Sequence, residues 1–207
     1  MRIDEKLNLV IPLSSDDKNV SLYVYHIPIS REVFEQNYRV MAATQAYIAS
    51  KGVRFQFGTG PRIATLTLKE EGLREAAQRG EVDKDGKPVD RATDALLLEI
   101  RRLTTILAPG SQGYETLPID TAIQRGLLDE DDWRETESIL VFFTFQYALE
   151  QKSKKRDMAM AIASVTKAVI TSSTPTEFLN SLQTSTKVEP SVKAEPLAHV
   201  EDSFIPS

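Results

Sequence analysis

The chain has 207 residues, of which 41% are hydrophobic and 27% are charged, and its formal net charge is -5. This length suits one compact domain with an appendage, and this composition excludes a chain that is unfolded throughout. The acidic balance disfavours nucleic acid as the main partner, and the absence of cysteine excludes disulfides, thiolate nucleophiles and thiolate metal sites.

The N-terminal segment has neither the pattern of a secretory signal nor that of a membrane span. Its apolar run, residues 7–13, is interrupted by Asn8 and Pro12, whereas a membrane span needs about 20 apolar residues. We therefore expect a cytoplasmic protein with no membrane partner.

Two β-rich runs open the chain. Residues 7–13 and 20–27 flank residues 14–19, which are turn formers, and this arrangement predicts a β-hairpin within residues 1–29. Pro12 has no amide donor, so we expect it at the end of its strand or on an edge.

An amphipathic helix is predicted over residues 31–50. Ser30 is a favourable N-cap, and Glu32 lies in the first turn, where a carboxylate suits the positive end of the helix dipole. Four large residues share one helical face: Phe34, Tyr38, Met41 and Ile48.

Pro61 is predicted to occupy the first position of the next helix, where its missing amide proton costs nothing. The apolar residues expected to face the core from this helix are Ile63, Leu66, Leu68 and Leu73. Residues 80–89 are polar and contain Gly86 and Pro88, which predicts a loop.

A third helix is predicted over residues 91–107. Its apolar stripe consists of Leu96, Ile100, Leu103 and Leu107. A short strand at residues 114–118 and a short helix at residues 119–125 are expected to follow.

Residues 127–174 contain neither glycine nor proline. We predict one helix over residues 131–151 and another over residues 156–170. The inner face of the second helix is expected to carry Met158, Ile162, Val165 and Val169. The apolar run 139–145 could instead form a buried strand, although its helical flanks favour the helix.

Residues 174–177 form a capping box, with Thr174 as the cap residue and Glu177 reaching back to it. Beyond it the composition becomes polar and proline-rich, which predicts a disordered tail over residues 184–207. The expected fold is α+β and predominantly helical. It consists of one domain, residues 1–183, in which the N-terminal β-hairpin is followed by a bundle of about five to six helices.

Catalytic, cofactor and metal sites find little support. His26 lies in a predicted strand and His199 in the predicted tail, so we expect no histidine-based nucleophile. The acidic run 129–132 is explained by the electrostatics of a helix start. Residues 81–86 begin like a calcium loop, but the twelfth position is Ala92 instead of glutamate. We predict no catalytic residue, metal or cofactor.

The aromatic residues at one end of the helix 131–151 are the candidate binding residues. Phe142, Phe143, Phe145 and Tyr147 cannot all face one direction on a helix. Part of this surface therefore contacts a second layer of the fold or awaits a partner. Core packing is the default interpretation, and partner binding is the functional one.

Several sequence blocks resemble a group of tail assembly chaperones from long-tailed bacteriophages. The similarity covers most of the predicted folded domain and excludes the tail. The blocks are residues 2–4 and 7–12, 28–34, 60–62, 99–103, 126–132, 176–178 and 181–182.

This resemblance implies a protein that is not an enzyme. Such chaperones bind the tape measure protein, keep its apolar helices soluble and help to recruit tail tube subunits. The resemblance places the protein in the host cell cytoplasm and outside the mature virion. Two other classes stay open: a structural virion component, such as a tail completion or adaptor protein, and a small enzyme that uses carboxylates or lysine.

Overall fold

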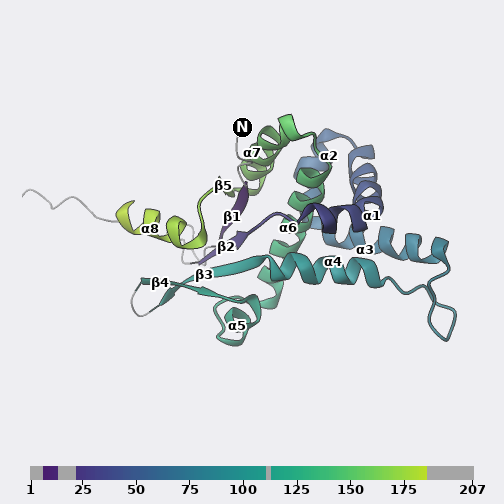
Figure 1. Cartoon of the computed structure of the whole chain (residues 1–207), viewed down its shortest axis with the longest axis horizontal. Helices are drawn as coiled ribbons and strands as arrows, with labels where there is room; N and C mark the ends of the chain where they lie inside the picture. The colour runs from purple at the N-terminus through teal and green to yellow at the C-terminus, as the bar shows by residue number, and fades with distance from the viewer. Residues whose placement is uncertain (1–6, 14–21, 111–112, 186–207) are drawn as a thin grey trace, which may run out of the picture.

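The computed structural model describes residues 7–13, 22–110 and 113–185. Five antiparallel strands form one sheet in the order β4-β3-β2-β1-β5 (Figure 1). The strands are β1 (Asn8–Leu13), β2 (Leu22–His26), β3 (Thr104–Gly110), β4 (Gly113–Leu117) and β5 (Val169–Thr171).

Eight α-helices lie within the described residues, so the predicted class, α+β and predominantly helical, is confirmed. The helices are α1 (Arg31–Ser50), α2 (Val53–Gly58), α3 (Gly60–Arg79), α4 (Arg91–Arg102), α5 (Ile119–Gln124), α6 (Glu130–Leu149), α7 (Lys155–Thr166) and α8 (Pro175–Ser185). A short 3-10 turn, Lys152–Lys154, precedes α7.

The predicted hairpin strands pair as expected, with Val10 opposite Tyr25. The predicted turn, residues 14–19, lies outside the described residues. Strand β5 pairs with Asn8, Leu9 and Val10 only, so Pro12 lies near the strand end and beyond the register of β5. A residue without an amide donor fits this position.

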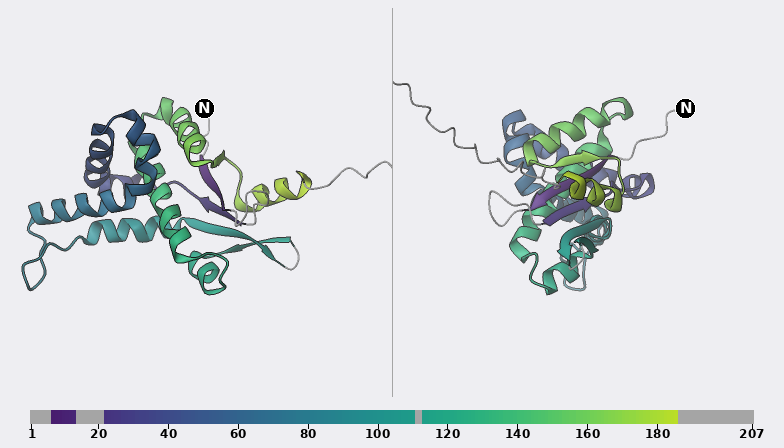
Figure 2. Two further views of the ribbon diagram at one scale, coloured as in Figure 1. Left: turned by 180° about the vertical axis from the view of Figure 1, so that it is seen from behind. Right: turned by 90° about the vertical axis from the view of Figure 1, so that its left-hand side faces the viewer.

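The two faces of the sheet are buried by different partners. Side chains alternate between the faces along each strand. Leu9, Val24 and Ile106 belong to the main core with the helices, whereas Val10 and Leu107 belong to a second, smaller cluster with α8. Figure 2 shows the helical layer on one side of the sheet and α8 on the other.

Helix α6 runs through the middle of the helical layer and packs against α1, α3, α4 and α7. The run 139–145 is therefore helical, as its flanks favoured, and the strand alternative is wrong. Asp129 caps the helix, because its carboxylate accepts a hydrogen bond from the Asp132 amide at 2.6 Å.

The third predicted helix is too long. Helix α4 ends at Arg102, and residues 104–110 form β3, so Leu107 belongs to a strand. The β-branched Thr104, Thr105 and Ile106 favour the strand, and pairing with β2 satisfies their backbone groups. The expectation failed because the leucine spacing continues a helical stripe across the boundary.

The helix predicted over residues 156–170 also ends early. Lys167 adopts a positive φ of 55° and terminates α7, and Val169 then enters β5. Val165 and Val169 are exposed and do not lie on the expected inner face, which Ile162 does occupy.

Small residues form most of the buried face of α3. Leu68 is buried as predicted, but Leu66 and Leu73 are 64% and 45% exposed. Gly72 lies on the buried face, where a Cβ atom would come within 1.7 Å of the Asp90 carboxylate. The N-terminus of α4 thus approaches the backbone of α3 too closely for a larger residue. Tyr38 of α1 is likewise exposed.

The capping box at the start of α8 is confirmed. The Glu177 amide donates to Thr174 Oγ1 at 3.3 Å, and the Thr174 amide donates to the Glu177 carboxylate at 2.7 Å. Helix α8 continues to Ser185, two residues beyond the predicted limit of the domain. The rest of the expected tail, residues 186–207, lies outside the described residues.

Candidate partner-binding groove

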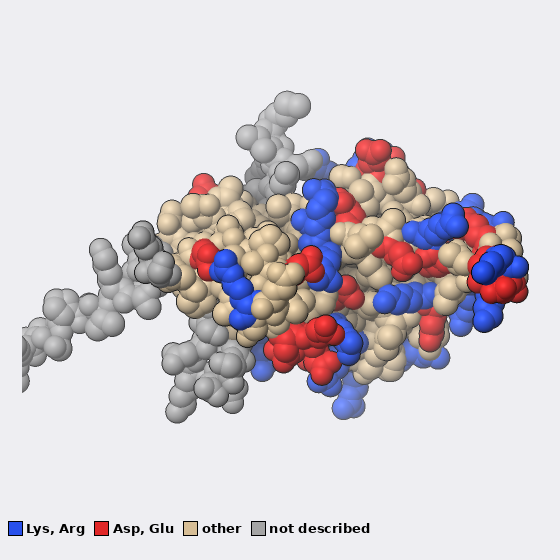
Figure 3. All heavy atoms as spheres, turned by 90° about the horizontal axis from the view of Figure 1, so that it is seen from below, with Lys and Arg blue, Asp and Glu red and all other residues tan. Residues whose placement is uncertain are grey.

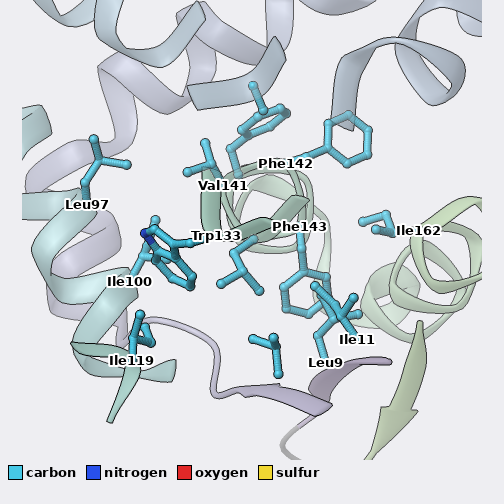
Figure 4. Close-up of a cluster of buried hydrophobic side chains, with 14 of the residues drawn as sticks. Leu9, Ile11, Leu97, Ile100, Ile119, Trp133, Val141, Phe142, Phe143 and Ile162 are labelled. Carbon is cyan, nitrogen blue, oxygen red and sulfur yellow. The ribbon is translucent and has the colours of Figure 1, made fainter. Parts of the chain in front are cut away.

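Three of the four candidate binding residues are core residues. Phe142 and Phe143 are 0% exposed, and Phe145 is 1% exposed. Figure 4 shows Phe142 and Phe143 leaving α6 in different directions, Phe143 toward Leu9 and Ile11 of β1. In this conformation they cannot form a surface for a partner, and we correct the expectation accordingly.

The helix can carry large residues all round because it is surrounded. The ring of Phe142 meets that of Phe57 in α2 at a centroid distance of 6.2 Å, and the ring of Phe143 lies 6.2 Å from that of His26 in β2. The helical layer therefore covers one side of α6 and the sheet the other. Packing within the chain therefore explains the surplus of aromatic residues on α6, and the explanation needs no partner protein.

Tyr147, the fourth candidate, reaches the surface at the C-terminal end of α6, where it is half-buried. Its ring stacks on that of Phe143 at 5.3 Å, and the Lys155 ammonium lies 4.7 Å from its centroid. The ring is thus held between the core on one side and a cation on the other.

Tyr147 lines a groove of about 330 Å³ between the start of α1, the end of α6 and the start of α7. Its apolar lining consists of Pro28, Ile29, Phe34, Tyr147 and Ala148, and its polar lining of Ser30, Arg31, Glu35, Thr144 and Lys155. This volume is at the lower end of the range of about 300–1,000 Å³ that is usual for ligand pockets.

Local capping fixes the α1 wall of the groove. The Val33 amide donates to Ser30 Oγ at 3.2 Å, which starts the helix at Arg31. Ile29 and Phe34 occupy the positions of a hydrophobic staple, just before the cap and one turn into the helix. This pattern is the sequence signal that could have indicated the α1 wall.

The groove has one cation without an acidic partner. Arg31 pairs with Glu35 at 2.7 Å across one turn of α1, and both side chains are exposed. Within residues 7–13, 22–110 and 113–185, no carboxylate forms an ion pair with Lys155. The groove therefore combines five apolar lining side chains with one cation, Lys155, whose charge no described carboxylate balances.

His26 is a core residue of β2. Thr104 donates its hydroxyl proton to the Ile100 carbonyl at 2.7 Å, so His26 Nδ1 donates to Thr104 Oγ1 at 2.9 Å. Nε2 is buried without a partner. Burial lowers the pKa of His26 from 6.5 to about 3, and an imidazole this inaccessible is unsuited to general acid-base catalysis.

The acidic segments stabilise local structure. Arg134 pairs with Glu130 and Asp131 in the first turns of α6, and the Asp83 carboxylate accepts from the amides of Asp85 and Lys87 in a turn. The described part of the chain contains no group of three or more histidine, cysteine, aspartate or glutamate residues able to hold a metal ion.

A second, polar cavity of about 200 Å³ lies where α1, α3 and α4 meet. It is lined in part by Arg39, Glu75 and Arg79, and both arginines pair with Glu75. Asp90 also lines the cavity, so its two arginines are balanced by two carboxylates. Figure 3 shows charged side chains crowded over this end of the molecule.

Across the described residues, no helix is long and apolar enough to span a membrane. Comparison of the chain with protein-family models, with curated proteins and with solved structures finds no match in any of the three.

Proposed function

We propose that this chain binds an apolar helix of another protein in the groove at Tyr147, and that it acts as a phage tail assembly chaperone for the tape measure protein. The observation that carries the proposal is the groove itself, which is open at the surface and has five apolar side chains in its lining. One of its walls, residues 28–34, is also one of the sequence blocks that resemble tail assembly chaperones.

The groove suits one or two apolar side chains of an amphipathic helix. Helix-in-groove recognition depends on apolar anchors spaced along one helical face. Phe34 and Tyr147 supply broad apolar surfaces, and aromatic residues are enriched at the energetic centres of protein interfaces. Binding of this kind requires shielding of apolar surface and no covalent chemistry.

The remainder of the proposal follows the resemblance. The protein works in the host cell cytoplasm, helps tail tube subunits to assemble around the client, and leaves before the virion is complete. A structural virion component could use the same groove, so the two functions differ in whether this polypeptide is present in purified particles.

The groove can be tested by co-expression with the tape measure protein. Ala148→Glu places a charge among the apolar lining residues of the groove, and Leu98→Glu is the matched control because Leu98 is 67% exposed on α4, away from the groove. We expect the first variant to bind the client at least about tenfold more weakly, a change of ~1.4 kcal/mol, and to keep less of it soluble. The control should behave like the unchanged chain.

Equal solubilisation by the folded Ala148→Glu variant and the control would exclude the groove as the client site. Mass spectrometry of purified virions tests the second part of the proposal. Stoichiometric amounts of this chain in mature particles would replace the chaperone function with a structural one.

A further inference from the structure

The polar cavity where α1, α3 and α4 meet holds charges of both signs that are only partly paired. Its volume is about 200 Å³, and it shares no lining residue with the groove at Tyr147. This volume lies below the range of about 300–1,000 Å³ that is usual for pockets of drug-sized ligands. The cavity therefore has room only for a small molecule, and its role is separate from the function proposed for the groove.

Asp90 places a negative charge over Gly72 of α3. A Cβ atom on Gly72 would come within 1.7 Å of Asp90 Oδ2, so this oxygen lies directly against the α3 backbone. The other oxygen, Oδ1, caps α4 by accepting from the Thr93 amide at 3.0 Å. Within residues 7–13, 22–110 and 113–185, no lysine or arginine forms an ion pair with Asp90. The described chain thus leaves this carboxylate without a cation.

A buried hydroxyl lies near this carboxylate. Thr93 lines the cavity and is 1% exposed, and its Oγ1 has no hydrogen-bond partner among the described residues. The same Cβ atom on Gly72 would come within 2.2 Å of Thr93 Oγ1, so Oγ1 and Asp90 Oδ2 both adjoin the space that a side chain at residue 72 would fill. A protonated amine carries three donors. The start of α4 therefore offers two oxygen acceptors to such a group.

The opposite charge lies about one turn along α3. Arg79 is held firmly, because it pairs with Glu75 at 3.3 Å and with a second carboxylate at 2.9 Å. The one ion pair of Arg39 among the described residues joins it to Glu75 at 4.0 Å, and its side chain is 69% exposed. Glu75 is three residues beyond Gly72, and side chains with this spacing on a helix lie about 5–6 Å apart. Arg39 can therefore receive an anionic group roughly one helical turn from Asp90.

We propose that this cavity binds a small ω-amino acid, with its ammonium at Asp90 and Thr93 and its carboxylate at Arg39. A lining in which arginines and carboxylates balance suits a ligand that itself carries both charges. An α-amino acid holds its two charges too close together to reach both groups, whereas γ-aminobutyrate and δ-aminovalerate span about one helical turn. Val40 and Ala92 also line the cavity and add apolar surface for the methylene groups.

Titration calorimetry of the full chain with four compounds tests the ligand class. γ-Aminobutyrate and δ-aminovalerate carry both charges, whereas butylamine lacks the carboxylate and butyrate lacks the ammonium. We expect the tighter-binding amino acid to bind at least about tenfold more tightly than either control, because each control loses the charge-assisted hydrogen bonds of one end. Absence of binding by both amino acids, or equal binding of all four compounds, would overturn the proposal.

Three variants test the location of the site. Asp90→Asn removes the charge but keeps a favourable N-cap residue, and Asp94→Asn is the matched control, because Asp94 lies in the first turn of the same helix and does not line the cavity. We expect the first variant to bind the tighter amino acid at least about tenfold more weakly and the second to bind it normally. Thr93→Val replaces an unpartnered hydroxyl with a methyl group, so it should weaken binding without lowering the thermal unfolding midpoint of the free chain. Equal binding by the two aspartate variants, or undiminished binding by Thr93→Val, would exclude the cavity as the site.

Discussion

Helices α6 and α8 are both rich in apolar residues, but they meet their surroundings in different ways. In α6 the apolar residues face all directions, and neighbouring elements surround them; Phe142, Phe143 and Phe145 are all buried. In α8 the described apolar residues Phe178, Leu179 and Leu182 pack with the cluster on the outer face of the sheet. An apolar surplus on a central helix thus reflects its burial on all sides, whereas a modest apolar stripe on a peripheral helix is enough to pack it against one face of a sheet.

The largest expected effect comes from truncating the α6 core. Phe142→Ala removes a fully buried ring and leaves a cavity, so we expect the free energy of unfolding to fall by about 3–5 kcal/mol. Leu179→Ala on α8 should cost only about 1–2 kcal/mol, because the helix can settle onto the smaller side chain. Urea denaturation of both variants measures the difference, and equal losses would break the contrast between the two helices.

The second effect tests whether water is excluded from the side of the sheet that faces α6. Burial holds the pKa of His26 near 3 in the folded chain, whereas its pKa is 6.5 in the unfolded chain. Between pH 3 and pH 6.5, His26 is therefore protonated in the unfolded chain and neutral in the folded chain. Stability therefore falls as pH decreases from about 6.5, and this residue alone should remove about 2 kcal/mol between pH 7 and pH 5.

The control for this experiment is His26→Gln, which stays neutral over the same range. The measurement is the change in unfolding free energy between pH 7 and pH 5 within each chain, so any packing defect of the variant cancels. The two chains should differ in this pH dependence, and identical profiles would show that water reaches the imidazole.

A smaller effect tests how closely α3 packs against the start of α4 in the helical layer. Gly72→Ala would bring a methyl group against the Asp90 carboxylate, which caps α4 by accepting from the Thr93 amide at 3.0 Å. Relief of the clash would weaken this cap, so we expect a net loss of about 1 kcal/mol despite the better helix propensity of alanine. Gly58→Ala is the control, because no atom lies within 4 Å of its added Cβ. The measurement is the thermal unfolding midpoint of each variant. Equal midpoints would show that the contact between Gly72 and Asp90 is loose enough to accept a methyl group.

Local signals predicted several elements of the fold correctly. Ser30 and Thr174 mark true helix starts, because capping depends on atoms within three residues of the cap. The first two strands were also predictable from their β-rich composition and the turn formers between them. In each case the deciding interactions lie close together in the sequence.

Long-range pairing explains what the sequence did not reveal. Thr104 is in a strand because it pairs with His26 of β2, and Val169 because it pairs with Val10 of β1. Neither partner can be inferred from local periodicity. The same limit applies to the groove: Tyr147 was a candidate, but Ile29 and Phe34 join it only through the packing of α1 against α6.

The smallest effect concerns the hydrogen bonds beneath α8. Tyr25→Phe removes the hydroxyl that links Asn8 to the Ser173 carbonyl, yet Asn8 Nδ2 already lies 3.3 Å from that carbonyl and can keep a hydrogen bond to it. A typical buried hydrogen bond contributes about 1 kcal/mol; because Asn8 can keep one of these bonds, we expect global stability to fall by less than that. If the segment at Ser173 anchors α8, hydrogen exchange should accelerate in α8 and not in α6. Equal acceleration in both helices would mean that α8 unfolds only together with the core, as an integral part of it.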